Sequence, residues 1–192
     1  MITIVDYGNT DATELSEFIK ELNFDIAISA NEPDIMRCDK LILPHCKDIS
    51  SSINKLHLLN LFSILRIIKK PILGIGTGMH LMTKTYKNKD AACLGCFPVE
   101  CESIYQPEGD IPKMKSINIV KESKLLNGIS NEDKFSFKSD CFISSNKYTT
   151  STAQINRGIT ASLEKEHLYG VQFNPEHSGK AGLKILKNFL QI

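Results

Sequence analysis

The most chemically suggestive stretch of this sequence is residues 71–82, which read PILGIGTGMHLM. The apolar residues after Pro71 predict a short buried strand, and three glycines then crowd a turn before a helix that is expected to begin at Met79. A strand, a sharp turn and a helix form a nucleophile elbow, in which the central residue presents a Ser or Cys side chain. Here the central residue is Gly76, which has no side chain. The sequence therefore predicts an elbow without a nucleophile.

The same glycines also resemble a dinucleotide-binding loop. Their spacing is GxGxG rather than GxGxxG, and they follow the fourth expected strand rather than the first. Nucleotide binding is therefore disfavoured. Cys46 beside His45 is a nominal thiol–base pair, although adjacent side chains in an extended loop usually point apart.

The six cysteines are expected to be reduced thiols that fill the core of a cytoplasmic protein, because the N-terminus lacks a signal-peptide pattern. Cys93 and Cys96, followed by Cys101, suggest a metal site. No second CxxC pair completes that site, and no His lies nearby in the sequence. We therefore expect neither a metal nor a cofactor.

Length and composition favour one domain over residues 1–192, with 42% hydrophobic residues and a net charge of +1. This charge does not indicate nucleic acid or an acidic membrane surface, and the longest apolar run is far short of a membrane span. We expect no nucleic-acid partner and no membrane partner.

Up to about residue 88 the hydrophobic pattern alternates between strand and helix. This predicts an α/β fold of three layers, with a mostly parallel central sheet flanked by helices. Expected strands cover 1–5, 24–29, 40–43 and 72–75, and one helix is expected over 53–68. The second half predicts a mixed or antiparallel portion and a final helix over 179–190 that Ser178 caps. Its expected strands cover 97–105, 114–120, 135–139, 141–144, 150–155, 159–163 and 168–173.

Four stretches in this order carry a family resemblance: MITIVDYGN at the start, LILP at 41–44, PILGIGTGMHLM at 71–82 and YGVQFNPEHSGKAGLKILKNFL at 169–190. The chain resembles the class I glutamine amidotransferases, and most closely the glutaminase subunit of imidazole glycerol phosphate synthase. The resemblance implies glutamine hydrolysis and transfer of ammonia to a (β/α)₈-barrel synthase or cyclase subunit in a heterodimer. Such pairs form an imidazole in histidine synthesis, and similar pairs amidinate surface sugars.

The family's chemistry needs a Cys nucleophile at the elbow, a His base and a Glu that orients the His. The family elbow G-I-C-x-G has Gly76 in the Cys position here, and the C-terminal motif Q-F-H-P-E has Asn174 in the His position. Glu176 remains. An amide cannot take up a proton near neutral pH. Two of the three catalytic roles are therefore empty.

Further departures affect the pocket that the resemblance implies. The family's P-G-x-G loop, which supplies an oxyanion donor, reads Pro44-His45-Cys46-Lys47, and His80 replaces a glutamine-contacting Gln. Lys138-Ser139-Asp140 replaces His-Ser-Tyr. The expected residues of the old pocket and oxyanion region are His45, Cys46, Thr77, Gly78, His80, Lys138, Ser139 and Asp140.

These losses favour a catalytically inactive subunit that still binds a barrel partner. One alternative is a regulatory module that binds another small molecule in the old pocket. A second alternative is an active amidotransferase with a repurposed site at Cys46 and His45.

Overall fold

The computed structural model describes residues 1–8, 10–86, 91–103, 113–138, 141–155 and 157–192. Its first half alternates strands and helices, as the hydrophobic pattern predicts. The elements are β1 (Ile2–Val5), α1 (Ala12–Lys20), β2 (Ile26–Ser29), α2 (Glu32–Arg37), β3 (Lys40–Leu43), α3 (Ile49–Leu58), α4 (Leu61–Ile67), β4 (Ile72–Ile75) and α5 (Thr77–Leu81).

The second half consists mainly of short strands, followed by one long helix. Its elements are β5 (Thr85–Tyr86), β6 (Ala91–Ala92), β7 (Glu100–Ser103), β8 (Lys113–Ser116), β9 (Asn118–Ile119), the 3₁₀ helix η2 (Lys124–Leu126), β10 (Lys134–Phe137), β11 (Cys141–Phe142), β12 (Thr149–Ile155), β13 (Arg157–Lys165), β14 (Leu168–Val171), the 3₁₀ helix η3 (Pro175–His177) and α6 (Gly179–Gln191).

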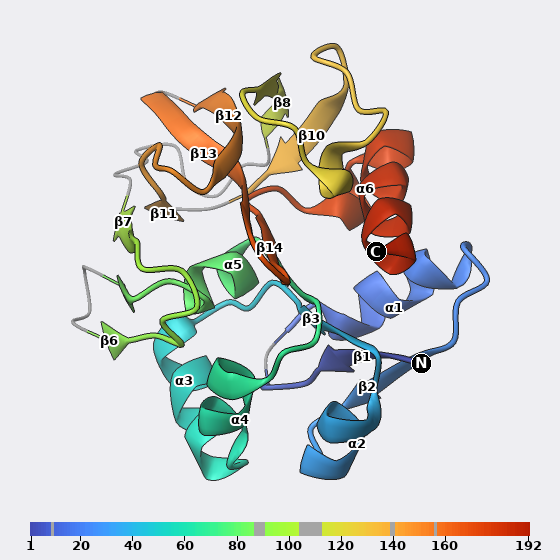
Figure 1. Cartoon of the computed structure of the whole chain (residues 1–192), viewed down its shortest axis with the longest axis vertical. Helices are drawn as coiled ribbons and strands as arrows, with labels where there is room; N and C mark the ends of the chain where they lie inside the picture. The colour runs from blue at the N-terminus through green and yellow to red at the C-terminus, as the bar shows by residue number, and fades with distance from the viewer. Residues whose placement is uncertain (9, 87–90, 104–112, 139–140, 156) are drawn as a thin grey trace.

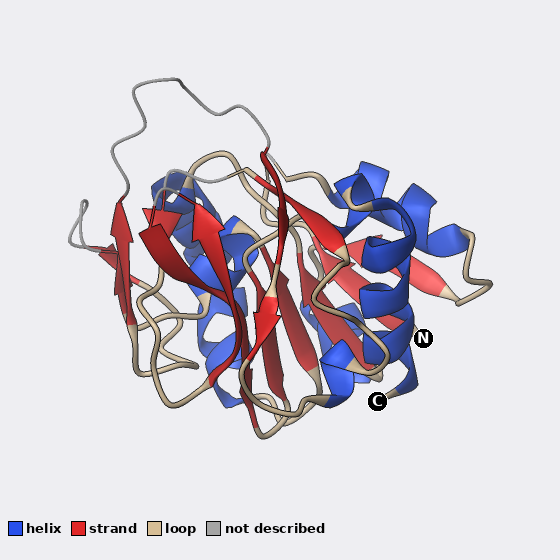
Figure 2. Cartoon of the chain, turned by 90° about the horizontal axis from the view of Figure 1, so that it is seen from above, coloured by secondary structure: helices blue, strands red, loops and turns tan. Residues whose placement is uncertain are grey.

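Within the described residues, eight strands form the main sheet in the order β2-β1-β3-β4-β14-β13-β12-β9. The first five strands pair in parallel, and β13, β12 and β9 continue the sheet in antiparallel fashion. Two smaller sheets, β10-β8 and β11-β7-β5-β6, flank it. The α/β class with a mixed second half is therefore confirmed (Figures 1 and 2).

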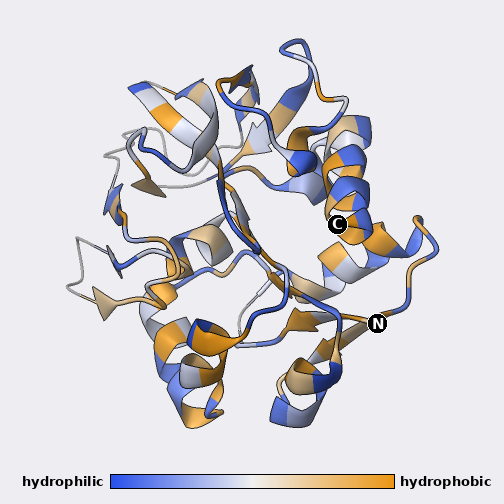
Figure 3. Ribbon diagram, in the orientation of Figure 1, coloured by the Kyte–Doolittle hydropathy of each residue, from blue (hydrophilic) through white to orange (hydrophobic). Residues whose placement is uncertain are grey.

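Helices cover both faces of the parallel part of the sheet. Alternate side chains along β3 point to opposite faces, so Leu41 and Leu43 join one buried cluster and Ile42 joins the other. The first cluster also includes residues of α2, α3, α4 and α5, and the second includes residues of α1 and α6. Helices α3, α4 and α6 carry both hydrophobic and hydrophilic residues, as expected of helices that cover a sheet (Figure 3).

The expected helix over 53–68 is wrong in two respects. It begins earlier, at Ile49, because the side chain of Asp48 accepts a hydrogen bond from the Ser51 amide at 2.9 Å. It is also two helices, because Asn60 adopts a left-handed conformation with φ of 58° between α3 and α4. Asn is one of the few residues that tolerate this conformation.

Three other sequence expectations need correction. The expected strand over 114–120 is two strands, β8 and β9, which belong to different sheets. Helix α5 begins at Thr77, directly after the elbow, rather than at Met79. Ser178 precedes α6 but does not cap it, because its hydroxyl donates to the Asn174 carbonyl and accepts from the Ser136 amide.

No helix among the described residues is long and apolar enough to cross a membrane.

Candidate functional site

The expected elbow is present at the carboxyl end of β4. Gly76 adopts φ of 55° and ψ of −120°, a conformation that residues with a Cβ atom rarely adopt. Its amide donates to the Val171 carbonyl of β14 at 2.8 Å, which ties the turn to the neighbouring strand. Gly78 permits close packing of α5, because a Cβ atom there would lie 2.1 Å from the Leu43 carbonyl oxygen.

The imidazole of His45 occupies the space that a nucleophile would need. A Cβ atom on Gly76 would lie 2.6 Å from His45 Nδ1, well inside van der Waals contact. The Thr77 amide also donates to His45 Nδ1, at 3.3 Å. In elbow enzymes the amide after the nucleophile is an oxyanion-hole donor. Here that donor already has a partner from the protein itself.

The loop that carries His45 is fixed against the elbow through Thr77. The Cys46 amide donates to Thr77 Oγ1 at 2.6 Å, and the Thr77 hydroxyl donates to the Cys46 carbonyl at 2.7 Å. The Asp11 amide donates to the His45 carbonyl at 3.0 Å, so the loop after β1 braces the same segment. These hydrogen bonds hold the His45 loop against the elbow.

Cys46 is poorly placed for nucleophilic chemistry. Its side chain is fully buried in the same hydrophobic cluster as the buried residues of α3. Burial raises the pKa of its thiol, while hydrogen bonds with Ser52 and Thr77 only partly oppose this shift. The thiol therefore stays protonated near neutral pH. Its hydrogen-bond partners are Ser52 and Thr77, whereas the His45 ring accepts the Thr77 amide at the elbow.

The residues at the three expected triad positions, Gly76, Asn174 and Glu176, lie together. Asn174 is buried, and its side-chain oxygen Oδ1 would lie 3.3 Å from a Cβ atom on Gly76. Its Nδ2 donates to Glu176 Oε1 at 3.0 Å. Among the described residues, Asn174 Oδ1 and Glu176 Oε2 are buried without a hydrogen-bond partner. The arrangement resembles a triad in shape, with an amide in place of the imidazole.

The buried carboxyl group of Glu176 should make the stability of the protein depend on pH. Burial raises the pKa of its carboxyl group above the usual value, so the folded protein holds this proton more tightly than the unfolded chain. Stability contributed by this group is therefore present at low pH and is lost as the pH rises above the unfolded pKa of about 4.3. Glu176→Gln should raise the melting temperature at pH 7, and the gain should shrink towards pH 4.

Thermal unfolding followed by circular dichroism from pH 4 to pH 8 would measure this effect. For a chain of this size, each 1 kcal/mol corresponds to about 2–4 °C in the melting temperature. Glu166→Gln is the matched control, because the Glu166 side chain is 70% exposed and its melting curve should not change. A lower melting temperature for Glu176→Gln at pH 7 would contradict the prediction.

His80 is fully buried one helical turn beyond the elbow. Its Nε2 lies 3.0 Å from Gln172 Oε1, and Gln172 Nε2 donates to the Cys141 carbonyl at 2.6 Å. The thiols of Cys101 and Cys141 also approach its ring. The sequence gives no spacing signal for this group, because His80, Cys101 and Cys141 lie far apart in the chain.

The structure describes only some of the remaining candidate residues. Lys138 follows β10 and is exposed, and Ser139 and Asp140 lie outside the described residues. Cys93 and Cys96 are both buried, and burial raises the pKa of each thiol to about 11. The described cysteines are free thiols, as expected of core residues.

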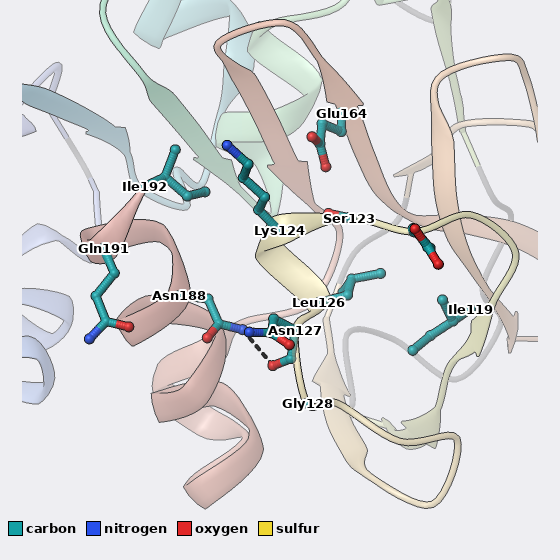
Figure 4. Close-up of a pocket in the computed structure, with 11 residues that line it drawn as sticks. Ile119, Ser123, Lys124, Leu126, Asn127, Gly128, Glu164, Asn188, Gln191 and Ile192 are labelled. Atoms are coloured by element: carbon teal, nitrogen blue, oxygen red, sulfur yellow. Dashed lines mark hydrogen bonds between the residues drawn. The ribbon is translucent and has the colours of Figure 1, made fainter.

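A surface hollow of about 750 Å³ lies away from the elbow, between η2 and the end of α6. Asn188 of α6 donates to the Asn127 carbonyl at 2.9 Å on its wall, and Glu164 and Lys124 also line it (Figure 4). None of its lining residues belongs to the elbow or to the triad positions.

The family model for glutamine amidotransferase class I matches residues 3–192. The chain belongs to this family. It is 29% identical over 199 residues to the imidazole glycerol phosphate synthase subunit HisH 1 of Vibrio vulnificus, covering all of this chain and 98% of the relative. It is 30% identical over 198 residues to subunit HisH of Buchnera aphidicola, covering all of this chain and 99% of the relative. The resemblance seen in the sequence is therefore confirmed.

Solved structures support the same fold. A glutamine amidotransferase structure superposes with a TM-score of 0.78 at 11% identity, covering 100% of this chain and 98% of that one. A structure of PurLQS from Thermotoga maritima superposes with a TM-score of 0.74 at 13% identity, covering 99% of this chain and 97% of that one. At these identities the likeness establishes the fold alone.

Proposed function

We propose that this class I glutamine amidotransferase family member is a catalytically inactive homologue of the HisH-type glutaminase subunit. The observation that carries the proposal is the His45 ring, which fills the nucleophile's space at Gly76 and accepts the Thr77 amide. Asn174 in the position of the base supports it independently. The chain would retain a glutaminase scaffold whose nucleophile, base and oxyanion donor are all lost or occupied.

The retained function would be binding of a (β/α)₈-barrel synthase or cyclase subunit in a cytoplasmic heterodimer. The similar proteins from Vibrio and Buchnera are themselves named as synthase subunits. In this proposal residues 1–192 act as one domain that stabilises or activates the barrel, which would use free ammonia. Either histidine-type imidazole formation or sugar amidination would suit such a pair.

The interface is expected on the edge of the sheet that carries the elbow. Glu14 lies in the first turn of α1, the helix that follows the carboxyl end of β1, and its side chain is 56% exposed. Glu166 lies just before β14, at the opposite edge, and its side chain is 70% exposed. These two glutamates form a matched pair for a charge-reversal test.

Co-purification and isothermal titration with a candidate barrel subunit from the same genome would test the proposal. Wild type should form a 1:1 complex and increase the ammonia-dependent activity of the barrel. Glu14→Arg should weaken the complex by about tenfold or more, equivalent to about 1.4 kcal/mol, whereas Glu166→Arg should leave it unchanged. Absence of a complex with any cognate barrel subunit would overturn the proposal.

The repurposed active site at Cys46 and His45 is less well supported, because the Cys46 thiol is buried and its raised pKa keeps it protonated. Ligand binding in the old pocket remains a prediction that a thermal-shift screen with a metabolite panel would test.

A further inference from the structure

Three side chains that bind soft metal ions meet behind the elbow. One ligand atom each from His80, Cys101 and Cys141 lies within 4.8 Å of the others, and all three residues are buried. They come from α5, β7 and β11. We infer that this group binds one Zn²⁺ ion, whereas the sequence alone led us to expect no metal. The inference does not depend on the proposed function.

Strand pairing explains why the two thiols meet. Strand β11 pairs with β7 in antiparallel fashion, with Cys141 opposite Ser103. Cys101 lies two residues before Ser103, on the same face, so it is the diagonal neighbour of Cys141. Strand β5 pairs with β7 on its other side, with Tyr86 opposite Cys101. The two cysteines are therefore held on one face by backbone pairing.

The hydrogen bonds of Gln172 prepare His80 as a ligand. Gln172 Nε2 donates to the Cys141 carbonyl, which leaves Gln172 Oε1 to accept from His80 Nε2–H at 3.0 Å. In a neutral imidazole the other nitrogen, Nδ1, then carries the lone pair. Metal-bound histidines commonly donate their second N–H to an oxygen in this way. The same Gln side chain thus links the His ligand to the strand of a Cys ligand.

The charge of this group suits a divalent ion in a buried site. Two thiolates and a neutral imidazole balance the charge of Zn²⁺, and binding releases the two thiol protons. The Tyr86 hydroxyl lies 2.7 Å from Cys141 Sγ, where it can donate a hydrogen bond to a metal-bound thiolate. Burying a neutral complex avoids the large penalty of burying a bare charge.

The spacing also suits zinc. Zn–S bonds of about 2.3 Å and Zn–N bonds of about 2.0–2.1 Å in a tetrahedron separate ligand atoms by roughly 3.5–3.8 Å. The three atoms lie within 4.8 Å of one another, so small side-chain rotations would close the site. Three protein ligands leave the fourth position for a water molecule or a small ligand.

Titration of the reduced, chelator-treated protein with Co²⁺ and then Zn²⁺ would test the inference. Wild type should bind one Co²⁺ per chain, with the intense visible bands of tetrahedral cobalt and a cobalt–thiolate charge-transfer band. Zn²⁺ should displace Co²⁺ and should raise the melting temperature, because the ion binds the folded state. Mg²⁺ should neither displace Co²⁺ nor raise the melting temperature.

Variants distinguish this group from the CxxC pair. Cys101→Ser, Cys141→Ser and His80→Gln should each weaken Zn²⁺ binding by about 100-fold or more. The double variant Cys93→Ser/Cys96→Ser is the matched control, because it also removes two buried thiols, and it should keep wild-type affinity. Circular dichroism of the apo variants would verify that each one folds.

X-ray absorption of the zinc-loaded wild type tests the ligand set without any substitution. Two sulfur ligands at about 2.3 Å and at least one nitrogen ligand at about 2.0–2.1 Å are expected. A shell of nitrogen and oxygen only, loss of binding in the Cys93→Ser/Cys96→Ser control, or absence of stoichiometric binding would overturn the inference.

Discussion

Glutamine should not be hydrolysed at a measurable rate by this protein, either alone or in the presence of a candidate barrel subunit. In enzymes whose nucleophile and base act as a unit, removing one or both lowers kcat by about 10⁶-fold. From a typical kcat of about 10 s⁻¹, such a loss leaves about 10⁻⁵ s⁻¹. Gly76 and Asn174 occupy the expected positions of these two groups. A coupled assay of glutamate and ammonia release, with a HisH-type enzyme as positive control, would measure this.

Restoring the two lost side chains should not be sufficient. In Gly76→Cys/Asn174→His the new Cβ atom would displace the His45 ring, but the ring would still lie beside the Thr77 amide and compete with an oxyanion for this donor. One oxyanion-hole donor is worth about 10²–10³-fold in kcat. Adding His45→Gly should therefore raise turnover by about that factor over the double variant, because it frees both the amide and the space beside residue 76.

One result would contradict the predicted lack of glutaminase activity. Ammonia release by the wild type that disappears in Cys46→Ser would support the repurposed site instead. Cys93→Ser is the appropriate control, because it removes another buried thiol away from the elbow loop.

The sequence pattern predicts the elbow and most of the strands, because these elements are determined by residues that are close together in the chain. The apolar run after Pro71 and the glycines of the turn specify β4 and Gly76 without reference to the rest of the chain. The break between α3 and α4 was missed because the apolar spacing continues through it. Only the left-handed conformation of Asn60 reveals the break, and that depends on how the two helices pack.

The contacts of the site were harder to predict because they join distant segments. The sequence identifies His45 as a replacement for a glycine but does not reveal that its ring turns towards Gly76. The grouping of Cys101 with Cys141 depends on the register of β7 and β11, which no short motif encodes. A diagonal pair of cysteines across two short strands leaves no spacing signal like that of Cys93 and Cys96.

Gly76→Cys should destabilise the protein, through two separable effects. A side chain at φ of 55° and ψ of −120° introduces backbone strain of about 1–3 kcal/mol. The new Cβ atom would also lie 2.6 Å from His45 Nδ1, so the imidazole must move and weaken its contact with the Thr77 amide. Urea denaturation should report the sum as a lower midpoint with an unchanged m-value.

A double-mutant cycle with His45→Ala would separate these effects. The Ala side chain removes the clash, so the double variant should be less destabilised than the sum of the single variants, with a coupling of about 0.5–3 kcal/mol. Gly179→Cys is the matched control, because Gly179 has a similar φ of 53° and nothing within 4 Å of its Cβ position. It should show backbone strain but no coupling to His45→Ala. Zero coupling at Gly76 would mean that the His45 ring does not fill the nucleophile's space, and wild-type stability of Gly76→Cys would mean that the elbow is unstrained.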